Sequence, residues 1–176
     1  MADDRSSEPK APPRDFQERL SERLRQVGAA TSAARLGLLI GEERWLVELN
    51  EAGEIVPIPG QMTPVPLTRE WFRGLVNLRG TLFGVTDLLR FLGDSPTPLA
   101  KESRLLAFGQ ALNVNAALLV TRMLGLHDPH GWRPEPARKH WAPWSGRCLV
   151  DAEGRDWHEL SLVRLAGDER FLQVSR

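Results

Sequence analysis

The second half of the chain holds the residue types that could do chemistry. Four histidines fall within 32 residues, and the single cysteine lies among them: His127, His130, His140, His158 and Cys148. The first two are spaced H-x-x-H and could supply part of a metal site, and a Cys/His pair could act as nucleophile and base. The spacing falls on a segment with proline and glycine, without a second cysteine or a carboxylate in a metal-binding pattern. A metal site is therefore disfavoured, and a lone cysteine in RCLVD is more typical of a strand core.

The segment 74–93, GLVNLRGTLFGVTDLLRFLG, places an Arg-Gly pair inside an apolar stretch. In one interpretation the pair is a tight turn, with Gly80 at positive φ and Arg79 in water. In the other, Arg79 is a positioned functional group, because an arginine in apolar surroundings needs a polar partner for its guanidinium. Asn77 is expected to bond to the backbone. Asp87 is expected to cap a short helix, since no second carboxylate lies near it for acid catalysis.

Composition favours a globular protein and argues against one that binds nucleic acid. The 176 residues carry 23 basic and 23 acidic side chains, and this zero net charge argues against nucleic acid as the main partner. The length and the 41% hydrophobic content are typical of a globular protein with a substantial core. One cysteine fits a reducing compartment. The sequence contains no G-x-S-x-G, phosphate-loop or dinucleotide motif.

Neither a secretory signal nor a membrane span is expected. The polar, proline-rich residues 1–14 contain no apolar stretch and are expected to be disordered. The longest uncharged run, at 105–121, is 17 residues long and includes Gln110, Asn113 and Asn115. Such a run predicts two strands and a turn rather than a membrane helix. We therefore expect a cytoplasmic protein without direct membrane insertion.

Two kinds of periodicity indicate the elements that position these residues. Residues 15–28 carry apolar side chains on one helical stripe between Asp15 and Gly28, which are suited to cap the ends. This helix docks either on its own domain or on a partner, and the sequence leaves both open. Strands are expected over 35–40, 44–49 and 54–58, in GLVNL, TLFGV, RLLAFG and ALLVTRMLGL, and in a hairpin of RCLVD and RDWHEL around DAEG.

The remaining segments are short helices or loops. REWF is expected to form a helical turn, DLLRFLG a very short helix ending at Gly93, ELSLVRL a short helix, and ERFLQV a last strand or tail. Residues 127–146 are expected to form a long polar loop. The tryptophans of this half either cover the core beneath that loop or form a protein interface: Trp132, Trp141, Trp144 and Trp157. Many short strands indicate a barrel or sandwich.

Three segments, EIVPIPGQMTPVP, GLVNLRGTLFGVTDLLRFLG and AALLVTRMLGL, resemble the CheW-like family of chemosensory coupling proteins. V-N-L-R-G followed by an apolar strand and D-L carries most of the resemblance, which covers residues 34–174. The tail resembles the PilI branch of type IV pilus twitching-motility systems. Residues 1–33 are then a polar extension with a short amphipathic helix. The chain departs from the family at Gly84, where many members have proline, and at Thr121, where many have an acidic residue.

The resemblance implies a mainly β fold of two intertwined, five-stranded SH3-like barrels with short helices. It implies no catalysis and no cofactor. The implied partners are the regulatory domain of a CheA-type histidine kinase and the cytoplasmic tip of a methyl-accepting chemoreceptor, which would recruit the protein to membrane-bound receptor arrays. A flagellar chemotaxis coupling protein, and a small enzyme using the second-half His and Cys residues, remain as alternatives.

The same motifs suggest where partners bind. Glu54 opens a strand that should lie in the same barrel as the Arg-Gly turn, so we expect an ion pair between Glu54 and Arg79 at the edge of that barrel. The apolar residues of 75–85 should lie mostly in the core, and one or two of Ile55, Val56 and Ile58 could be exposed for a receptor helix. The expected protein-binding residues are Glu54, Ile55, Asn77, Leu78, Arg79 and Gly80.

Overall fold

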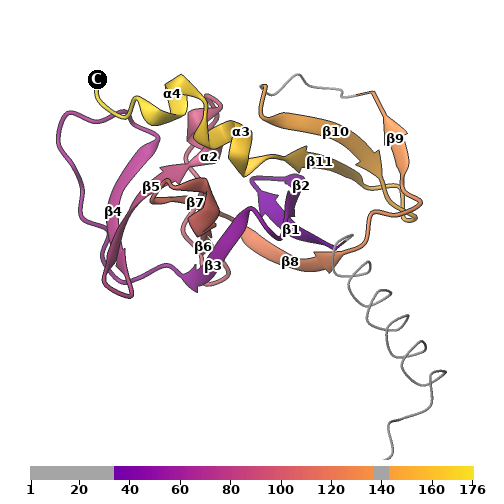
Figure 1. The fold of residues 1–176 in the computed structure, drawn as a ribbon, viewed down its shortest axis with the longest axis horizontal. Coiled ribbons are helices and arrows are strands. Elements are labelled where there is room, and N and C mark those ends of the chain that lie inside the picture. Colours follow the sequence, from indigo (N-terminus) through magenta and orange to yellow (C-terminus); the bar gives the residue numbers. More distant parts are fainter. Residues whose placement is uncertain (1–33, 137–142) are drawn as a thin grey trace, which may run out of the picture. The chain divides into compact units, whose positions relative to one another are not determined.

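A computed structural model describes residues 34–136 and 143–176, which fold mainly as β-strands (Figure 1). The helix expected over residues 15–28 lies outside the described residues. The strands are β1 (Arg35–Ile40), β2 (Glu43–Glu48), β3 (Ala52–Pro57), β4 (Phe72–Leu78), β5 (Thr81–Asp87), β6 (Arg104–Phe108), β7 (Ala116–Val120), β8 (Arg122–His127), β9 (Arg133–Glu135), β10 (Ser145–Val150) and β11 (Asp156–Leu160). Short helices are α2 (Leu88–Phe91), the 3₁₀ turn η1 (Gln110–Leu112), α3 (Leu162–Ala166) and α4 (Glu169–Leu172).

Two mixed sheets share these strands in an interleaved order. One sheet has the order β8-β1-β2-β11-β10-β9, and the other has the order β3-β6-β7-β5-β4. The N-terminal hairpin β1–β2 therefore belongs to the sheet of the C-terminal strands, where β2 pairs in parallel with β11. The expected intertwined, mainly β architecture is confirmed.

The expected strand number is correct for one sheet and wrong for the other. The second sheet has five strands, but the first has six, because β9 pairs with β10 within the segment expected to be a loop. Pro134 sits in the middle of β9 and lacks a backbone N–H. Proline is tolerated on an edge strand, and β9 lies at the edge of its sheet. The prediction of a loop, which followed from the proline-rich composition, is therefore wrong for residues 133–135.

The five-stranded sheet curls so that its two edges approach each other. β3 and β4 are its edge strands, yet Val56 of β3 and Val76 of β4 pack against the same buried cluster. Glu54 of β3 also reaches Arg79, which directly follows β4, at 2.8 Å. These contacts bring the two edges of the sheet together, and the closed barrel implied by the resemblance stays a prediction.

A common apolar core joins the two sheets. Its buried members come from both sheets and from the helices, and include Leu38, Trp45, Leu106, Leu118, Leu162 and Phe171. The strand β7 is buried at all five positions, which is typical of a strand covered on both faces. The described residues from 34 onward therefore form one packed domain rather than two sheets linked by a tether.

Asp151 fixes the hairpin between β10 and β11. Its carboxylate accepts hydrogen bonds from Trp157 Nε1 at 2.9 Å and from the Arg155 backbone N at 2.9 Å and side-chain Nε at 2.7 Å. Burial raises the pKa of Asp151, but these hydrogen bonds and the Arg155 charge outweigh it and lower the pKa to about 2. The DAEG turn expected from sequence is confirmed, with its aspartate as the main acceptor.

Two local predictions differ from the structure. REWF forms a turn closed by a 3.0 Å hydrogen bond from Phe72 N to Arg69 O, and β4 begins at Phe72, so the expected helical turn is absent from this described segment. ERFLQV begins with α4 rather than with a strand. Asp168 caps this helix by accepting from the backbone N–H groups of Arg170 and Phe171, and the buried Phe171 ring anchors it.

Candidate protein-docking site

The Arg79–Gly80 turn joins β4 to β5 by the shortest type of hairpin connection. Leu78 pairs with Thr81, so only two residues form the turn. Both have positive φ, 51° for Arg79 and 89° for Gly80, as a type I′ turn requires. Gly80 N donates to Asn77 Oδ1 at 2.7 Å, which confirms that the Asn77 amide bonds to the backbone. The turn is therefore a rigid platform for the Arg79 side chain.

The predicted ion pair between Arg79 and Glu54 is confirmed. Arg79 Nη2 lies 2.8 Å from Glu54 Oε1, and the two side chains are 83% and 35% exposed. A pair this exposed contributes only about 0–1 kcal/mol to folding, because water screens both charges. The structure shows that Arg79 projects into water and also has a defined polar partner, and a functional role for it stays a prediction.

The other expected site residues are divided between the inside and the outside of the sheet. Leu78 packs against the inner cluster, whereas Ile55 is exposed. Leu82, expected to lie in the core, is 56% exposed and sits opposite Asn77 in the hairpin register. The structure thus adds Leu82 to the polar turn as an exposed apolar neighbour. Because successive side chains of a strand point to opposite faces, Leu82 faces away from Phe83, which packs inside.

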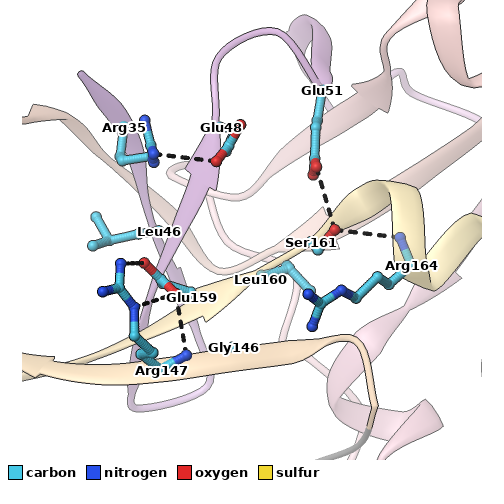
Figure 2. A pocket seen from close by; sticks show the side chains of 10 residues that line it. All are labelled: Arg35, Leu46, Glu48, Glu51, Gly146, Arg147, Glu159, Leu160, Ser161 and Arg164. Atoms are coloured by element: carbon cyan, nitrogen blue, oxygen red, sulfur yellow. Dashed lines mark hydrogen bonds and ion pairs between the residues drawn. The ribbon is translucent and has the colours of Figure 1, made fainter. Parts of the chain in front are cut away.

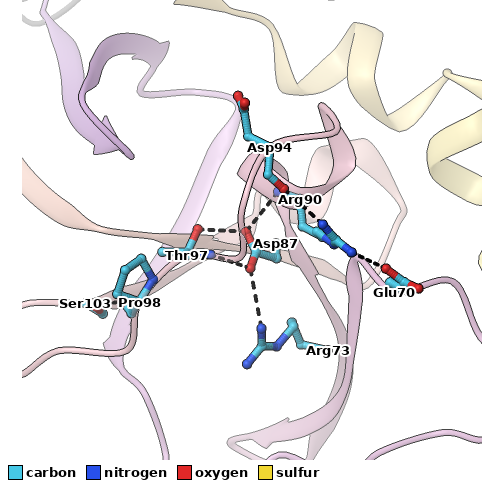
Figure 3. A network of polar contacts seen from close by, with 8 residues as sticks. All are labelled: Glu70, Arg73, Asp87, Arg90, Asp94, Thr97, Pro98 and Ser103. Carbon is cyan, nitrogen blue, oxygen red and sulfur yellow. Dashed lines mark hydrogen bonds and ion pairs between the residues drawn. The ribbon is translucent and has the colours of Figure 1, made fainter.

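Asp87 holds the far end of β5 and the start of α2 (Figure 3). Its buried carboxylate accepts from the α2 backbone at Arg90 N (3.3 Å), which confirms the expected helix cap. It also accepts from Thr97 N at 2.9 Å and Thr97 Oγ1 at 2.7 Å, with Arg73 Nη1 at 3.5 Å. Gly93, at φ 93°, follows the helix as expected. Asp87 is therefore a structural acceptor that ties the loop after α2 to the sheet.

The second-half histidines and cysteine do not form a catalytic or metal site within the described residues. Cys148 and His158 are opposite each other in the β10–β11 register, but both are buried, and a nucleophile requires access to its substrate. His127 packs its ring 4.5 Å from that of Trp157. Residues 34–136 and 143–176 contain no group of three or more His, Cys, Asp or Glu that could hold a metal ion. His140 lies outside the described residues.

The tryptophans that the structure describes serve the core. Trp144 and Trp157 are buried, and Trp132 packs against the cluster that contains Trp157. This agrees with the first interpretation, in which they cover the core. Trp141 lies outside the described residues. None of the helices among the described residues is long and apolar enough to cross a membrane.

A polar cavity of about 290 Å³ lies over the six-stranded sheet beside α3 (Figure 2). Its charges are largely compensated by neighbours: Arg35 pairs with Glu48 at 3.1 Å, and Arg147 pairs with Glu159 at 3.0 Å. The hydrogen bond with Glu159 raises the pKa of Arg147. Glu51 accepts from the first backbone N–H of α3. These contacts pair most of the charges that line the cavity with neighbouring groups.

Comparison with known proteins places this chain in a family. Residues 36–169 match the family model of the CheW-like domain. Over 105 residues, which cover 59% of this chain and 58% of the relative, the chain is 33% identical to Protein PilI of Pseudomonas aeruginosa. Over 73 residues, 42% of this chain and 47% of the relative, it is 34% identical to Chemotaxis protein CheW of Thermotoga maritima. The matches span less than two thirds of either curated relative.

A solved structure supports the same fold. The scaffolding protein TtCheW from Thermoanaerobacter tengcongensis superposes with a TM-score of 0.61 at 21% identity, covering 74% of this chain and 90% of that one. The family model covers residues 36–169, which is well over half of the chain. The chain belongs to the CheW-like family, a family of non-enzymatic scaffolding proteins.

Proposed function

We propose that the chain is an adaptor that couples a chemoreceptor to a CheA-type histidine kinase in a system controlling type IV pilus twitching motility. Family membership supports the coupling role, and the similarity to PilI supports the pilus system. The adaptor performs no reaction. It holds two partners in a fixed relation, so a change in the receptor alters the output of the kinase. Contact with the receptor recruits it from the cytoplasm to the membrane-bound array.

The observation that carries the proposal is the exposed ion pair between Arg79 and Glu54. Both residues of the turn adopt a left-handed conformation, and Asn77 bonds to its backbone, yet the Arg79 side chain that the turn presents is 83% exposed. The pair itself stabilises the fold little. A rigid arginine beside the exposed Leu82 has the character of an interface hot spot, where arginine and apolar anchors are enriched. We assign this surface to the kinase regulatory domain.

Titration calorimetry of the full chain with the regulatory domain of a CheA-type kinase from the same cell tests the assignment. Arg79→Ala is expected to weaken binding about tenfold or more, since hot-spot truncations exceed about 1 kcal/mol. Arg79→Lys should weaken it less but measurably, because lysine lacks the planar fork that reaches Glu54 and a partner together. Circular dichroism of both variants should match the wild type.

Arg147→Ala is the matched control. Arg147 and Glu159 form a similar pair on the other sheet, with side chains 73% and 27% exposed. Its removal should leave kinase binding unchanged. Equal weakening by Arg79→Ala and Arg147→Ala would reveal a general charge effect and refute the assignment. Wild-type binding in Arg79→Ala would move the kinase contact elsewhere on the adaptor.

A chemotaxis coupling protein is the second candidate, because the chain also resembles Chemotaxis protein CheW of Thermotoga maritima. Deletion of the gene distinguishes the two systems. The pilus assignment predicts loss of twitching zones beneath agar with swimming rings intact. Loss of swimming with normal twitching would replace it with the chemotaxis assignment.

A further inference from the structure

Leu67 has a backbone conformation that leucine rarely adopts. It is the third residue of the turn from Val65 to Thr68, follows Pro66, and has a φ of 59°. Proline second and positive φ third is the arrangement of a type II turn, whose third position normally takes glycine or asparagine. A bulky residue with positive φ is an outlier, because its Cβ crowds the backbone.

The side chain of Leu67 gains nothing from this position within the described part of the chain. It is 83% exposed, more than any other large apolar side chain that the structure describes. Isolated exposed leucines are ordinary on protein surfaces, but this one combines exposure with backbone strain. Glycine or asparagine would fit the turn better and would expose less apolar surface. The fold therefore gives no reason for leucine here.

The surrounding structure holds the strained turn firmly in place. Thr68 Oγ1 donates to Val65 O at 2.8 Å across the turn. The C-terminal tail pairs with it: Arg69 N donates to Val174 O at 2.8 Å, and Arg176 N donates to Leu67 O at 3.0 Å. Strained residues that are fixed from several sides cluster at functional sites.

Basic groups surround this leucine. Arg69 and Arg176 lie on the turn and on the tail paired with it, and the Arg69 Nε donates to Ser175 O at 3.1 Å. Glu70 pairs with Arg90 of α2 (Figure 3), and Arg176 approaches the same carboxylate at 4.0 Å. Arg90 and Arg176 thus share one glutamate, and the Arg69 side chain bonds to the backbone of the tail instead. A partner surface that complements this region would be apolar at its centre and acidic at its rim.

We propose that Leu67 is the apolar anchor of a second docking surface, which inserts into a hole between packed helices rimmed by acidic side chains. Helical bundles offer such holes, each formed by four side chains that accept a leucine. The inference rests on the proposed function, and it assigns this surface to the helical hairpin tip of the chemoreceptor. An adaptor requires two separate surfaces, and the Arg79 turn serves the kinase.

The positions of the two surfaces agree with this division. Leu67 precedes β4, which begins at Phe72, and Arg79 directly follows its last residue, Leu78, so the strand separates the two residues along the chain. Seven strand residues span about 20 Å. One partner could therefore occupy the Arg79 turn without covering Leu67.

The test compares the full-length wild type with Leu67→Asn, using the cytoplasmic signalling fragment of a methyl-accepting chemoreceptor from the same cell. Asparagine tolerates positive φ but removes the apolar anchor. Leu67→Asn should bind the fragment about tenfold more weakly or worse, with unchanged kinase affinity. Its melting temperature should be equal to or higher than that of the wild type, because the strain is relieved. If Leu67 had only a structural role, its replacement by asparagine would not weaken receptor binding while keeping the melting temperature equal or raising it.

Two further variants sharpen the comparison. Leu67→Met keeps an apolar side chain and should bind nearly as well as the wild type. Leu99→Asn makes the same chemical change at an exposed leucine in the loop before β6 and should leave receptor binding unchanged. Wild-type receptor affinity in Leu67→Asn, or equal loss in Leu99→Asn, would overturn the inference. A wild type that binds the kinase domain but not the receptor fragment would also overturn it while leaving the kinase contact intact. Binding of neither partner would overturn the proposed function as well.

Discussion

Replacing Asp87 by alanine should destabilise the domain far more than the loss of a helix cap. The carboxylate is fully buried and accepts hydrogen bonds from the α2 backbone and from both donors of Thr97. Loss of the cap costs about 1 kcal/mol. The Thr97 N–H and hydroxyl would remain buried without their acceptor, at about 1–3 kcal/mol each. The expected decrease in the free energy of unfolding is about 3–7 kcal/mol.

Asp168→Ala provides the matched comparison. Asp168 caps α4 through two backbone N–H groups and has a cap's role alone, so its loss should cost about 1 kcal/mol. Equilibrium urea unfolding, followed by tryptophan fluorescence, measures both variants under the same conditions. The difference between them, about 2–6 kcal/mol, is the contribution of the Thr97 contacts.

Two additional variants keep the prediction testable if the Asp87→Ala protein does not fold. Asp87→Asn retains one carbonyl acceptor and should cost less than Asp87→Ala. Thr97→Val removes the hydroxyl, and the double variant with Asp87→Ala should lose less than the sum of the single losses, because the two groups share a bond. An Asp87→Ala cost no larger than that of Asp168→Ala would refute the account, as would additive losses in the double variant.

Two other changes test the turns that shape the sheets. Asp151 has a pKa lowered from 3.8 to about 2 in the folded protein, so its stabilisation is fully present above pH 3.8 and is lost as the pH falls toward 2. The free energy of unfolding of the wild type should exceed that of Asp151→Asn by at most about 2 kcal/mol near neutral pH. In urea titrations this difference should shrink steadily between about pH 5 and pH 2. A difference that stays constant with pH would contradict the lowered pKa. Gly74→Ala should cost about 2 kcal/mol or more, because its φ is 119° and a Cβ would lie 2.2 Å from the Thr63 carbonyl oxygen. Gly154→Ala, with positive φ but open space around the Cβ, should cost only about 1 kcal/mol in the same unfolding assay, and equal losses would refute the steric argument.

Local features could be predicted from the sequence because their causes lie within a few residues. The range of β1 agrees with the predicted 35–40, and the Asn77 bond to Gly80 spans three residues. Asp87 caps the helix that begins at the next residue. In each case one side chain and the adjacent backbone determine the geometry. The ion pair of Glu54 with Arg79 spans 25 positions and was expected only through the family resemblance.

Features that depend on distant strands could not be predicted in this way. Leu82 and Phe83 are adjacent and apolar, and the sequence does not show which one faces the inside until the curvature of the sheet is known. β9 becomes a strand because β10 offers it an edge, despite Pro134. The positive φ of Leu67 contradicts the preference of its own residue type, so only the turn that contains it and the C-terminal tail explain it.

One of the two connections between the described sheets, from β7 to β8, bears on the proposed coupling. β7 of one sheet ends at Val120 and β8 of the other begins at Arg122, so a single residue, Thr121, joins them. Its backbone N donates to Leu39 O at 2.9 Å, and its hydroxyl accepts from Gly41 N at 2.9 Å. Where many family members place an acidic residue, threonine thus fastens the junction to the β1–β2 hairpin by neutral hydrogen bonds. The two bonds and the shared core fasten this junction of the five-stranded sheet to the β1–β2 hairpin of the six-stranded sheet. Under the proposed function, we therefore expect coupling to depend on where the partners dock rather than on a change of shape within the adaptor.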